Sequence, residues 1–552
     1  MEKRIILAIV LSFLVLILYQ AIFVKKPPQS EVRPEEKIQV EKKPEEKILE
    51  KETPPPSKVA QEKKVEAEEK SFPQIEAQAE EQILLDTSLY YALWSNRGGV
   101  LKSWKLKKYK DDKKEDLELV SLHAGEVNKY PFSLETEDPE FNDLINNSFY
   151  KSSIANLKLK DGQKGEIRLE YADGKGTRVE KIFTFSDGNY DFHLEINVWK
   201  NGQKIEPRLV WGPSLGNPSV TEQRQRFGGG SGIAILSSGR VYRQSERKFK
   251  PEESAFNFVN WAAYEDNYFV ALILANAQKA NAVFIREIKG QTPYFFLSVT
   301  DAQRIYIGPK EFGHLDKFGS QAKRVINFGF FGWIAEILLR AIKFFHNYIP
   351  NWGFAIIFLT LIIKIIFFPL TYSSTKSMAR MQELQPKIKA LRAKYKKAKQ
   401  DISQRRQMNE EMMKLYKEHG INPAGGCLPM LIQIPVFWGF FRLLVVGIEF
   451  RHSPFILWIK DLSVKDPYYV TPILMGVSQF ISQKMTPTSA DPSQAKMMLI
   501  MPVIMTIFFM NFQSGLVLYW LTSNVLQIGQ QYIMNRLMNK KKRETHGKRR
   551  KK

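Results

Sequence analysis

The chain has 552 residues, and its 81 lysines and arginines against 58 aspartates and glutamates give a formal net charge of +23. This length accommodates two or three domains, and the positive balance favours acidic partners such as anionic lipid headgroups, nucleic acid or acidic polypeptide. The single cysteine, Cys427, excludes an intramolecular disulfide.

The first predicted element is an apolar segment at residues 5–24. Twenty helical residues at about 1.5 Å each reach about 30 Å, the thickness of a bilayer's hydrocarbon core. The segment ends in two lysines and two prolines without a small-residue cleavage site, so residues 1–24 are predicted to be an uncleaved membrane anchor. Residues 25–81 begin with a stretch rich in Lys, Glu, Pro and Gln, whose composition predicts a disordered tether on the periplasmic side.

Residues 82–319 have the texture of a β domain. Short alternating runs at residues 166–171, 179–185 and 190–198 are separated by turn signals, including Asp187-Gly188. Period-two alternation broken about every ten residues predicts an antiparallel β-sandwich.

A predicted amphipathic helix follows within residues 320–350. Four polar residues fall at helical spacing on one face, and apolar residues surround them: Glu336, Arg340, Lys343 and Asn347. Such a helix is typical of a membrane interface. The alternative is an ordinary amphipathic helix packed on the β domain.

Residues 351–538 are predicted to form a core of five membrane spans. The five apolar runs are residues 352–372, 427–448, 468–485, 497–512 and 515–534. Between the first two runs, the basic residues 373–426 predict a cytoplasmic helical hairpin broken near residues 400–403. With the anchor, the fold class is a polytopic α-helical membrane protein of about six spans that carries a large β-sandwich domain.

The distribution of positive charge predicts the orientation. The hairpin and the tail at residues 539–552 are strongly basic, whereas residues 449–467 are balanced in charge, so the hairpin and the tail are expected in the cytoplasm. Four spans separate the hairpin from the tail, and an even number of spans places both on the same side of the membrane. Both chain ends are then cytoplasmic and the β domain is periplasmic in a bacterial inner membrane.

Polar residues inside the spans are the candidate functional residues, because they are costly in hydrocarbon. Lys364 lies near the middle of the first core span, four residues after Thr360, and no acidic residue lies within the spans to neutralise it. A charged lysine at that depth requires a hydrated cavity. With Lys364, a set of polar residues on the other spans could line one groove: Thr360, Gln433, Trp520, Ser523, Asn524 and Gln527. Hydrogen bonding between helices without a cavity is the alternative.

Enzyme signatures are weak. The seven histidines are scattered, the glycine-rich residues 228–232 lack the Gly-Lys-Ser/Thr of a phosphate loop, and no nucleophile elbow is present. We expect no cofactor, metal or small-molecule substrate. Two function classes remain open on these residues: a transporter or channel, because polar stripes within spans also mark solute paths, and a membrane-anchored carbohydrate-binding or carbohydrate-processing protein, because large β-sandwiches often bind sugars.

Several segments resemble the YidC/Oxa/Alb family of membrane protein insertases, of the Gram-negative type with a large periplasmic domain. They are residues 352–386 (WGFAIIFLTLIIKIIFFPLTYSSTKSMARMQELQP), 422–435 (NPAGGCLPMLIQIP), 454–469 (PFILWIKDLSVKDPYY), 501–524 (MPVIMTIFFMNFQSGLVLYWLTSN), 95–99 (SNRGG), 261–269 (WAAYEDNYF) and 306–310 (YIGPK). Together the resemblance covers nearly the whole chain except the tether.

The resemblance implies a chaperone and insertase for nascent membrane proteins that works without covalent chemistry, alone or with the Sec translocon. It implies a five-helix core, a periplasmic β-supersandwich, and a hydrophilic groove open to cytoplasm and lipid, with groove positions at Lys364, Thr360, Gln433 and Trp520. The family usually has arginine where this chain has Lys364. The basic hairpin and tail are expected to contact the ribosome or anionic lipid through Arg392, Lys394, Lys396, Lys397, Arg405, Arg406, Arg549 and Arg550.

Overall fold

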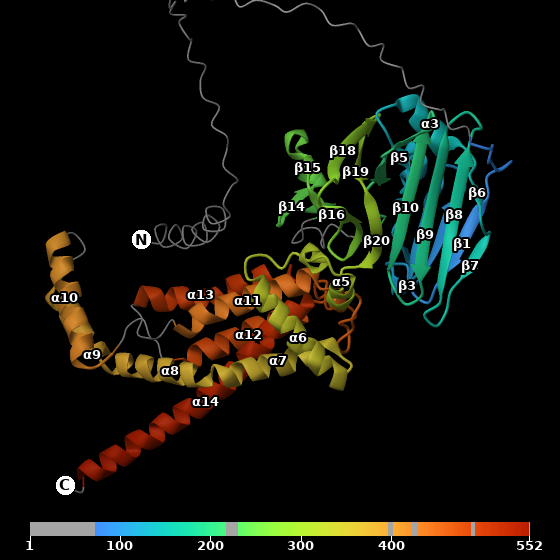
Figure 1. Ribbon diagram of the computed structural model, residues 1–552. Coiled ribbons are helices and arrows are strands. Elements are labelled where there is room, and N and C mark those ends of the chain that lie inside the picture. Colours follow the sequence, from blue (N-terminus) through green and yellow to red (C-terminus); the bar gives the residue numbers. More distant parts are fainter. Residues whose placement is uncertain (1–71, 217–229, 396–400, 422–427, 487–491, 551–552) are drawn as a thin grey trace, which may run out of the picture. The chain divides into compact units, whose positions relative to one another are not determined.

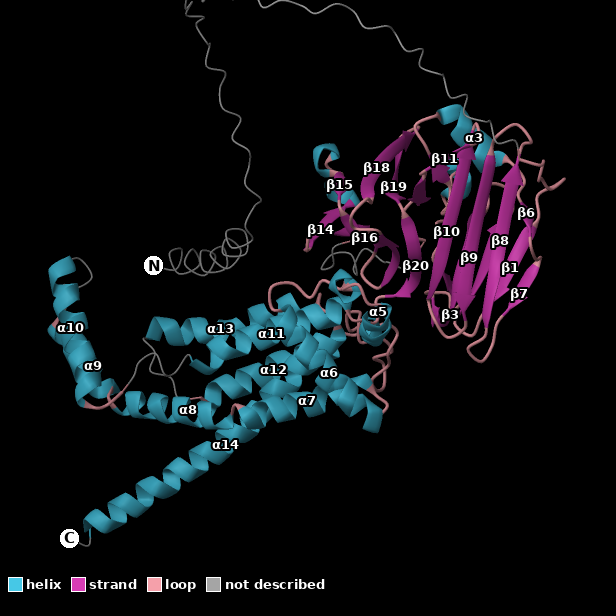
Figure 2. Cartoon of the chain, viewed as in Figure 1, coloured by secondary structure: helices cyan, strands magenta, loops and turns pink. Residues whose placement is uncertain are grey.

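The protein is described from a computed structural model, which defines residues 72–216, 230–395, 401–421, 428–486 and 492–550. The predicted anchor and most of the predicted tether lie outside the described residues. Strands occupy the chain from Gln82 to Pro309, and the described chain from Phe312 onward is helical (Figure 2). The prediction of a β-rich domain followed by helices is confirmed.

Three sheets build the β domain (Figure 1). The first has the order β4 (Asp116–Glu118), β3 (Val100–Lys110), β2 (Tyr90–Ser95), β1 (Gln82–Asp86) and β7 (Asn156–Lys158). The second has the order β14 (Arg240–Ser245), β13 (Gly232–Ser237), β16 (Val259–Glu265), β17 (Phe269–Ala275), β20 (Ala302–Pro309), β10 (Asp191–Lys200), β9 (Arg178–Ser186), β8 (Lys164–Ala172) and β6 (Lys151–Ser152), with β11 (Gln203–Ile205) paired to β10. The third has the order β15 (Ala255–Asn257), β18 (Asn281–Lys289), β19 (Thr292–Thr300), β12 (Arg208–Trp211) and β5 (Leu134–Glu135).

Aromatic side chains join the first two sheets. The Trp94 ring of β2 lies 5.4 Å from Phe183 of β9, and the Trp104 ring of β3 lies 5.7 Å from Phe192 of β10. All four side chains are buried. Large rings at this spacing fill the space between facing sheets, and their burial supplies much of the stabilising free energy of such a core.

A buried lysine ties the β2–β3 turn to the second sheet. Lys181 of β9 is fully buried, and its Nζ donates to the carbonyl oxygens of Gly98 at 2.7 Å, Gly99 at 3.2 Å and Phe132 at 2.7 Å. The turn needs glycine at residue 98, because its φ is +67° and a Cβ atom there would lie 2.3 Å from the Asn146 carbonyl oxygen. Lys181 therefore provides the hydrogen-bond donor for three buried carbonyl groups, which offsets the free-energy cost of their burial.

This lysine makes the stability of the β domain depend on pH. Burial lowers the pKa of Lys181 to about 7, whereas an unfolded lysine titrates near about 10.4. Between these values the unfolded chain binds more protons, so the free energy of unfolding is expected to rise from pH 7 to pH 9. Melting curves at pH 7, 8 and 9 test this, with Lys181→Met expected to lose that part of the dependence. A stability that falls over this window would contradict the assignment.

The helices form the rest of the described chain. Within or directly after the β domain lie α2 (Ala124–Val127), α3 (Pro139–Asn147), α5 (Phe312–Phe318) and the short 3-10 turns η1 (Glu246–Lys248), η2 (Pro251–Glu253) and η3 (Ala322–Val325). The later elements are α6 (Gly332–Tyr348), α7 (Trp352–Ile366), α8 (Phe368–Glu383), α9 (Gln385–Lys394), α10 (Ile402–Glu418), α11 (Leu428–Val446), η5 (Ile448–Phe450), α12 (Val470–Met485), α13 (Pro492–Phe509) and α14 (Ser514–Arg550).

Helix α6 has two apolar surfaces. Ala335, Leu338, Leu339 and Ile342 are buried, and Leu338 closes on α11, where a Cβ atom at Gly439 would lie 3.1 Å from its Cδ1. A second set of apolar side chains is exposed: Trp333, Ile337, Phe344 and Tyr348. A helix thus lies within the predicted range and packs on α11, while its place at a membrane interface stays a prediction.

Each of the five predicted apolar runs contains helix, in α7 with α8, α11, α12, α13 and α14 (Figure 1). Taken one at a time, the helices of the described chain are too short or too polar to cross a bilayer. The pair α7 and α8, bent by 58° at their junction, meets that requirement when both are taken together.

Candidate functional site

Lys364 lies in the last turn of α7 and meets α14. Its Nζ donates a hydrogen bond of 3.1 Å to Oε1 of Gln527. No carboxylate of the described chain forms an ion pair with it. The ammonium group is thus part of a hydrogen-bonded contact between α7 and α14.

A second glutamine of α14 holds the backbone at the same place. Nε2 of Gln530 donates to the Lys364 carbonyl oxygen at 3.2 Å. Helix α7 ends two residues later because Pro369, in the first turn of α8, cannot donate a backbone hydrogen bond and disfavours continuation of α7. Carbonyl groups in the last turn of a helix need outside donors. Gln527 and Gln530, three residues apart, therefore anchor the lysine side chain and the bent end of α7 together.

Thr360 lies one turn before Lys364 but does not contact it by a hydrogen bond. Its side chain is buried, and Oγ1 donates to the Ile356 carbonyl oxygen of the same helix at 2.7 Å. On the opposite side of α7 three large apolar residues are exposed: Phe354, Phe358 and Ile362.

The predicted groove residues of α14 contact a different neighbour. Trp520 Nε1 donates to Gln479 Oε1 of α12 at 3.3 Å. Nδ2 of Asn524 donates to the Met475 carbonyl oxygen at 3.2 Å and to Ser478 Oγ at 3.3 Å, both on α12. Ser523 is buried. These contacts match the alternative of hydrogen bonding between helices.

Gln433 of α11 makes a third contact with α14, through its Nε2 and the Tyr519 hydroxyl group. Helix α14 is thus the shared partner, with polar contacts to α7, α11 and α12. The structure brings Lys364 and Gln527 together, and it places Gln433 at the pair α11 and α14 and both Trp520 and Asn524 at the pair α12 and α14.

Three further polar residues of this layer were not singled out from the sequence: Gln479, Tyr519 and Gln530. Their signal was present, since each is polar within an apolar run. Helical spacing relative to Trp520 and Asn524 does not identify Gln479, Tyr519 and Gln530, because each of these three residues forms its hydrogen bond with a residue of another helix.

Gln527 is expected to act through Lys364. For the membrane protein insertion that the family resemblance implies, Gln527→Leu should lower the rate with an acidic-flanked substrate about tenfold, because a hydrogen bond to a charged group contributes about 1.5 kcal/mol. In a Lys364→Met background the same change should add nothing, because the shared contact is already absent. Insertion rates of the four variants test this coupling. Gln483→Leu on α12 is the matched control, and additive effects of the two changes would refute the coupling.

The predicted basic hairpin is helical. The small core here consists of Met381 of α8, Leu384, Ile388 of α9 and Ile421, and Met412, Leu415 and Tyr416 of α10 pack against it. Helix α9 ends at Lys394 and α10 begins at Ile402. Lys394 pairs with Glu411 at 2.8 Å and Arg406 with Glu410 at 3.5 Å, while Arg392 and Arg405 are exposed. Lys396 and Lys397 lie outside the described residues. Arg549 and Arg550 lie at the end of α14, where side chains are not described.

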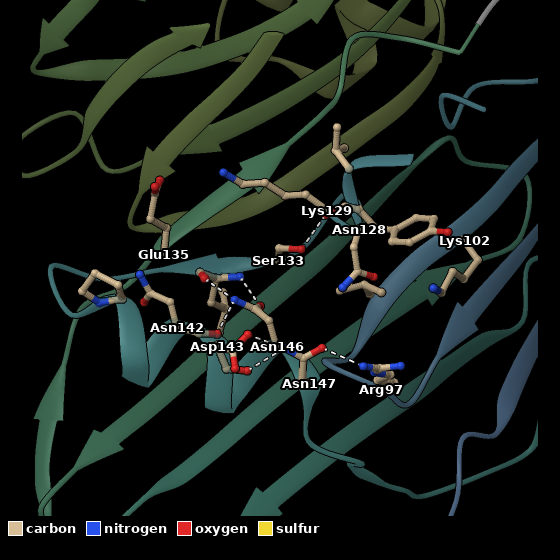
Figure 3. Close-up of a pocket in the computed structure, with 15 residues that line it drawn as sticks. Arg97, Lys102, Asn128, Lys129, Ser133, Glu135, Asn142, Asp143, Asn146 and Asn147 are labelled. Carbon is tan, nitrogen blue, oxygen red and sulfur yellow. Dashed lines mark hydrogen bonds between the residues drawn. The ribbon is translucent and has the colours of Figure 1, made fainter. Parts of the chain in front are cut away.

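A polar pocket of about 390 Å³ lies in the β domain (Figure 3). Its floor is formed by amide groups that already have partners: Asn146 Nδ2 donates to the Leu134 carbonyl oxygen at 2.7 Å, and Asn147 Oδ1 accepts from Arg97 at 2.9 Å. The Lys102 Nζ lies 3.6 Å above the centre of the Tyr130 ring. Asn146 and Asn147 of α3 therefore serve to hold this helix to β5 and to Arg97.

The described residues contain no group of three or more His, Cys, Asp or Glu side chains that could hold a metal ion.

Family comparisons match both parts of the chain. A model described as YidC periplasmic domain matches residues 82–341, and one described as 60Kd inner membrane protein matches residues 344–542. A protein of Syntrophus aciditrophicus (strain SB), named Membrane protein insertase YidC, is 38% identical over 565 residues, which cover 97% of this chain and 100% of the relative. A protein of the same name from Geobacter sp. (strain M21) is 40% identical over 473 residues, which cover 83% of this chain and 86% of the relative. The chain therefore belongs to the YidC family of membrane protein insertases.

Proposed function

We propose that this chain inserts nascent membrane proteins into the bacterial inner membrane along a polar path that passes Lys364. The observation that carries the proposal is a lysine in an apolar helix whose ammonium group is held by the Gln527 amide, without a carboxylate among its described partners. A positive charge left without a counter-charge attracts an acidic group that enters from outside.

The mechanism follows from this charge. The polar, often acidic, flank of an incoming segment enters a hydrated groove that opens to the cytoplasm and lipid, and it is attracted to Lys364. The apolar part slides along the exposed apolar faces of the helices. A shorter hydrocarbon path lowers the desolvation cost of the flank, and burial of apolar surface in lipid, at about 25 cal/mol per Å², drives the transfer. No nucleotide, cofactor or covalent step is required.

The proposed topology has six spans, with both chain ends in the cytoplasm and a β-supersandwich in the periplasm. The anchor at residues 1–24 and the tether at residues 25–81 precede the β domain at residues 82–319. The α6 region at residues 320–350 lies at the interface, and a five-span core occupies residues 351–538. Basic residues in the hairpin at residues 373–426 and in the tail at residues 539–552 support this orientation.

The hairpin and the tail are the proposed contacts for the ribosome and for anionic lipid. Exposed Arg392 and Arg405 support this assignment for the hairpin, and binding through such charges weakens as salt rises. Cooperation with the Sec translocon is part of the same proposal and rests on family membership.

Reconstitution tests the function. The purified chain in vesicles is expected to insert a small single-span substrate in the absence of nucleotide, and empty vesicles serve as the control. Solute flux without insertion would instead favour a transporter.

A further inference from the structure

The loop between η5 and α12, residues 451–469, presents an apolar tip. Leu457 at this tip is 71% exposed, and its neighbour Ile456 is 45% exposed. Tyr468, later in the same loop, is 68% exposed. Isolated exposed apolar residues are ordinary on protein surfaces. The evidence that this tip has a binding partner therefore comes from its backbone conformation and from the residues around it.

Leu457 has a left-handed backbone conformation with φ of +52°. This conformation costs a residue with a Cβ atom about 1–2 kcal/mol, whereas glycine adopts it freely. A leucine here therefore has a conformational cost, and its exposed side chain recovers little of that cost by packing within the chain. A strained residue that does not contribute to the core points to a partner outside the fold.

The loop is held rigidly behind its tip. Both carboxylate oxygens of Asp466 accept hydrogen bonds, Oδ1 from Trp458 Nε1 at 3.1 Å and Oδ2 from Thr471 N at 2.8 Å. Asn351, at the start of α7, donates through Nδ2 to the Phe455 carbonyl oxygen at 3.0 Å. These contacts fix the loop on both sides of Leu457, so the exposed position of the tip is built into the fold.

Close packing against α7 supports the same conclusion. A Cβ atom at Gly353 would lie 2.1 Å from Cδ2 of Phe455, so glycine is required where the loop presses on α7. The Phe354 and Phe455 rings are also in contact, with centroids 5.3 Å apart.

The surroundings of the tip are those of a membrane interface. Helix α12 starts directly after the loop and exposes Ile473 and Leu474. At the same end of the bundle, α6 meets α7, since the His346 and Trp352 rings stack at 3.8 Å. Tyr348, at the end of α6 that meets α7, is exposed, and tyrosine is enriched where hydrocarbon meets headgroups.

We propose that the tip of this loop, Ile456 and Leu457, inserts into the headgroup and upper acyl region of the outer leaflet. The loop leads directly into α12, whose beginning exposes Ile473 and Leu474, and this favours lipid as the partner. The loop then anchors the periplasmic end of the bundle. This inference rests on the proposed membrane orientation but not on insertion activity.

Spin labelling tests the proposal in the full-length chain. In a Cys427→Ser background, which removes the single cysteine, Leu457→Cys and Lys460→Cys each carry a nitroxide in phosphatidylethanolamine and phosphatidylglycerol vesicles. Lys460 is the matched control, since it is exposed in the same loop. The ratio of relaxation by oxygen to relaxation by a water-soluble nickel chelate is expected to be at least about threefold higher at residue 457, because oxygen concentrates in lipid and the chelate is excluded from it.

Equal ratios at the two positions would overturn the proposal. Exclusion of both reagents from residue 457 would also overturn it, since that result indicates a protein partner. Because neither measurement needs a translocated substrate, their failure leaves the insertase proposal standing.

A second variant separates lipid contact from folding. Leu457→Gly removes the side chain and relieves the left-handed strain, so the melting temperature in detergent is expected to stay equal or rise. A marked fall would show that Leu457 stabilises the fold itself and would overturn the proposal.

Discussion

Lys364→Glu is expected to reduce insertion of substrates with acidic flanks by at least about tenfold. Reversal of the charge replaces attraction by repulsion, and two unit charges about 4 Å apart interact with about 4 kcal/mol at an effective dielectric constant of about 20. Partial hydration reduces this value, but about 1.4 kcal/mol is enough for a tenfold change. The measurement is the initial rate of insertion into vesicles for matched substrates with acidic and neutral flanks.

Lys364→Arg is the control for this prediction. Arginine keeps the positive charge and offers donors to Gln527, so insertion of the acidic substrate is expected to remain within about twofold of the unchanged chain. Equal rates for lysine, arginine and glutamate at residue 364 would remove the electrostatic step from the mechanism.

Lys181→Met is expected to destabilise the β domain by about 3 kcal/mol. Methionine matches the aliphatic length of lysine but donates no hydrogen bond, so the carbonyl groups of Gly98, Gly99 and Phe132 lose their shared donor. Each buried carbonyl group left without a partner costs on the order of 1–3 kcal/mol, with partial relief from relaxation or water entry. Denaturant titration at pH 7, followed by circular dichroism, measures the change.

Lys164→Met is the matched substitution, because Lys164 on β8 is exposed. It should change the free energy of unfolding by no more than about 0.5 kcal/mol. A similarly small effect for Lys181→Met would show that the three carbonyl groups find other hydrogen-bond donors when the lysine is absent.

Strand prediction succeeded where the sequence carries strong local signals. Residues 166–171 and 179–185 fall within β8 and β9, and residues 190–198 begin one residue before β10, since alternation buries one face of each strand and Gly174 and Gly188 take the left-handed conformations of the turns. The order of strands was not predicted, because pairing depends on contacts between distant segments.

The bundle shows the same division between local and distant information. The helices follow from apolar composition, but the separation of α7 from α8 reflects Pro369, whose effect depends on neighbouring donors such as Gln530. Likewise, the polar stripe on α14 is visible in the sequence. Which of its neighbours α7, α11 and α12 each polar residue of α14 contacts depends on side-chain direction in the packed bundle.

The buried Lys181 had no sequence signal of its own. It lies in a strand of alternating character, and the carbonyl groups that bind it come from the β2–β3 turn and from Phe132, far away in the chain. Only the folded arrangement distinguishes it from an ordinary surface lysine.

Thiol accessibility at residue 364 tests the central claim that water reaches this position from the cytoplasm. A Lys364→Cys variant in a Cys427→Ser background is treated with a membrane-impermeant thiol reagent in inverted vesicles and in right-side-out vesicles. The account predicts labelling in inverted vesicles only. Labelling from the periplasmic side, or no labelling from either side, would contradict it.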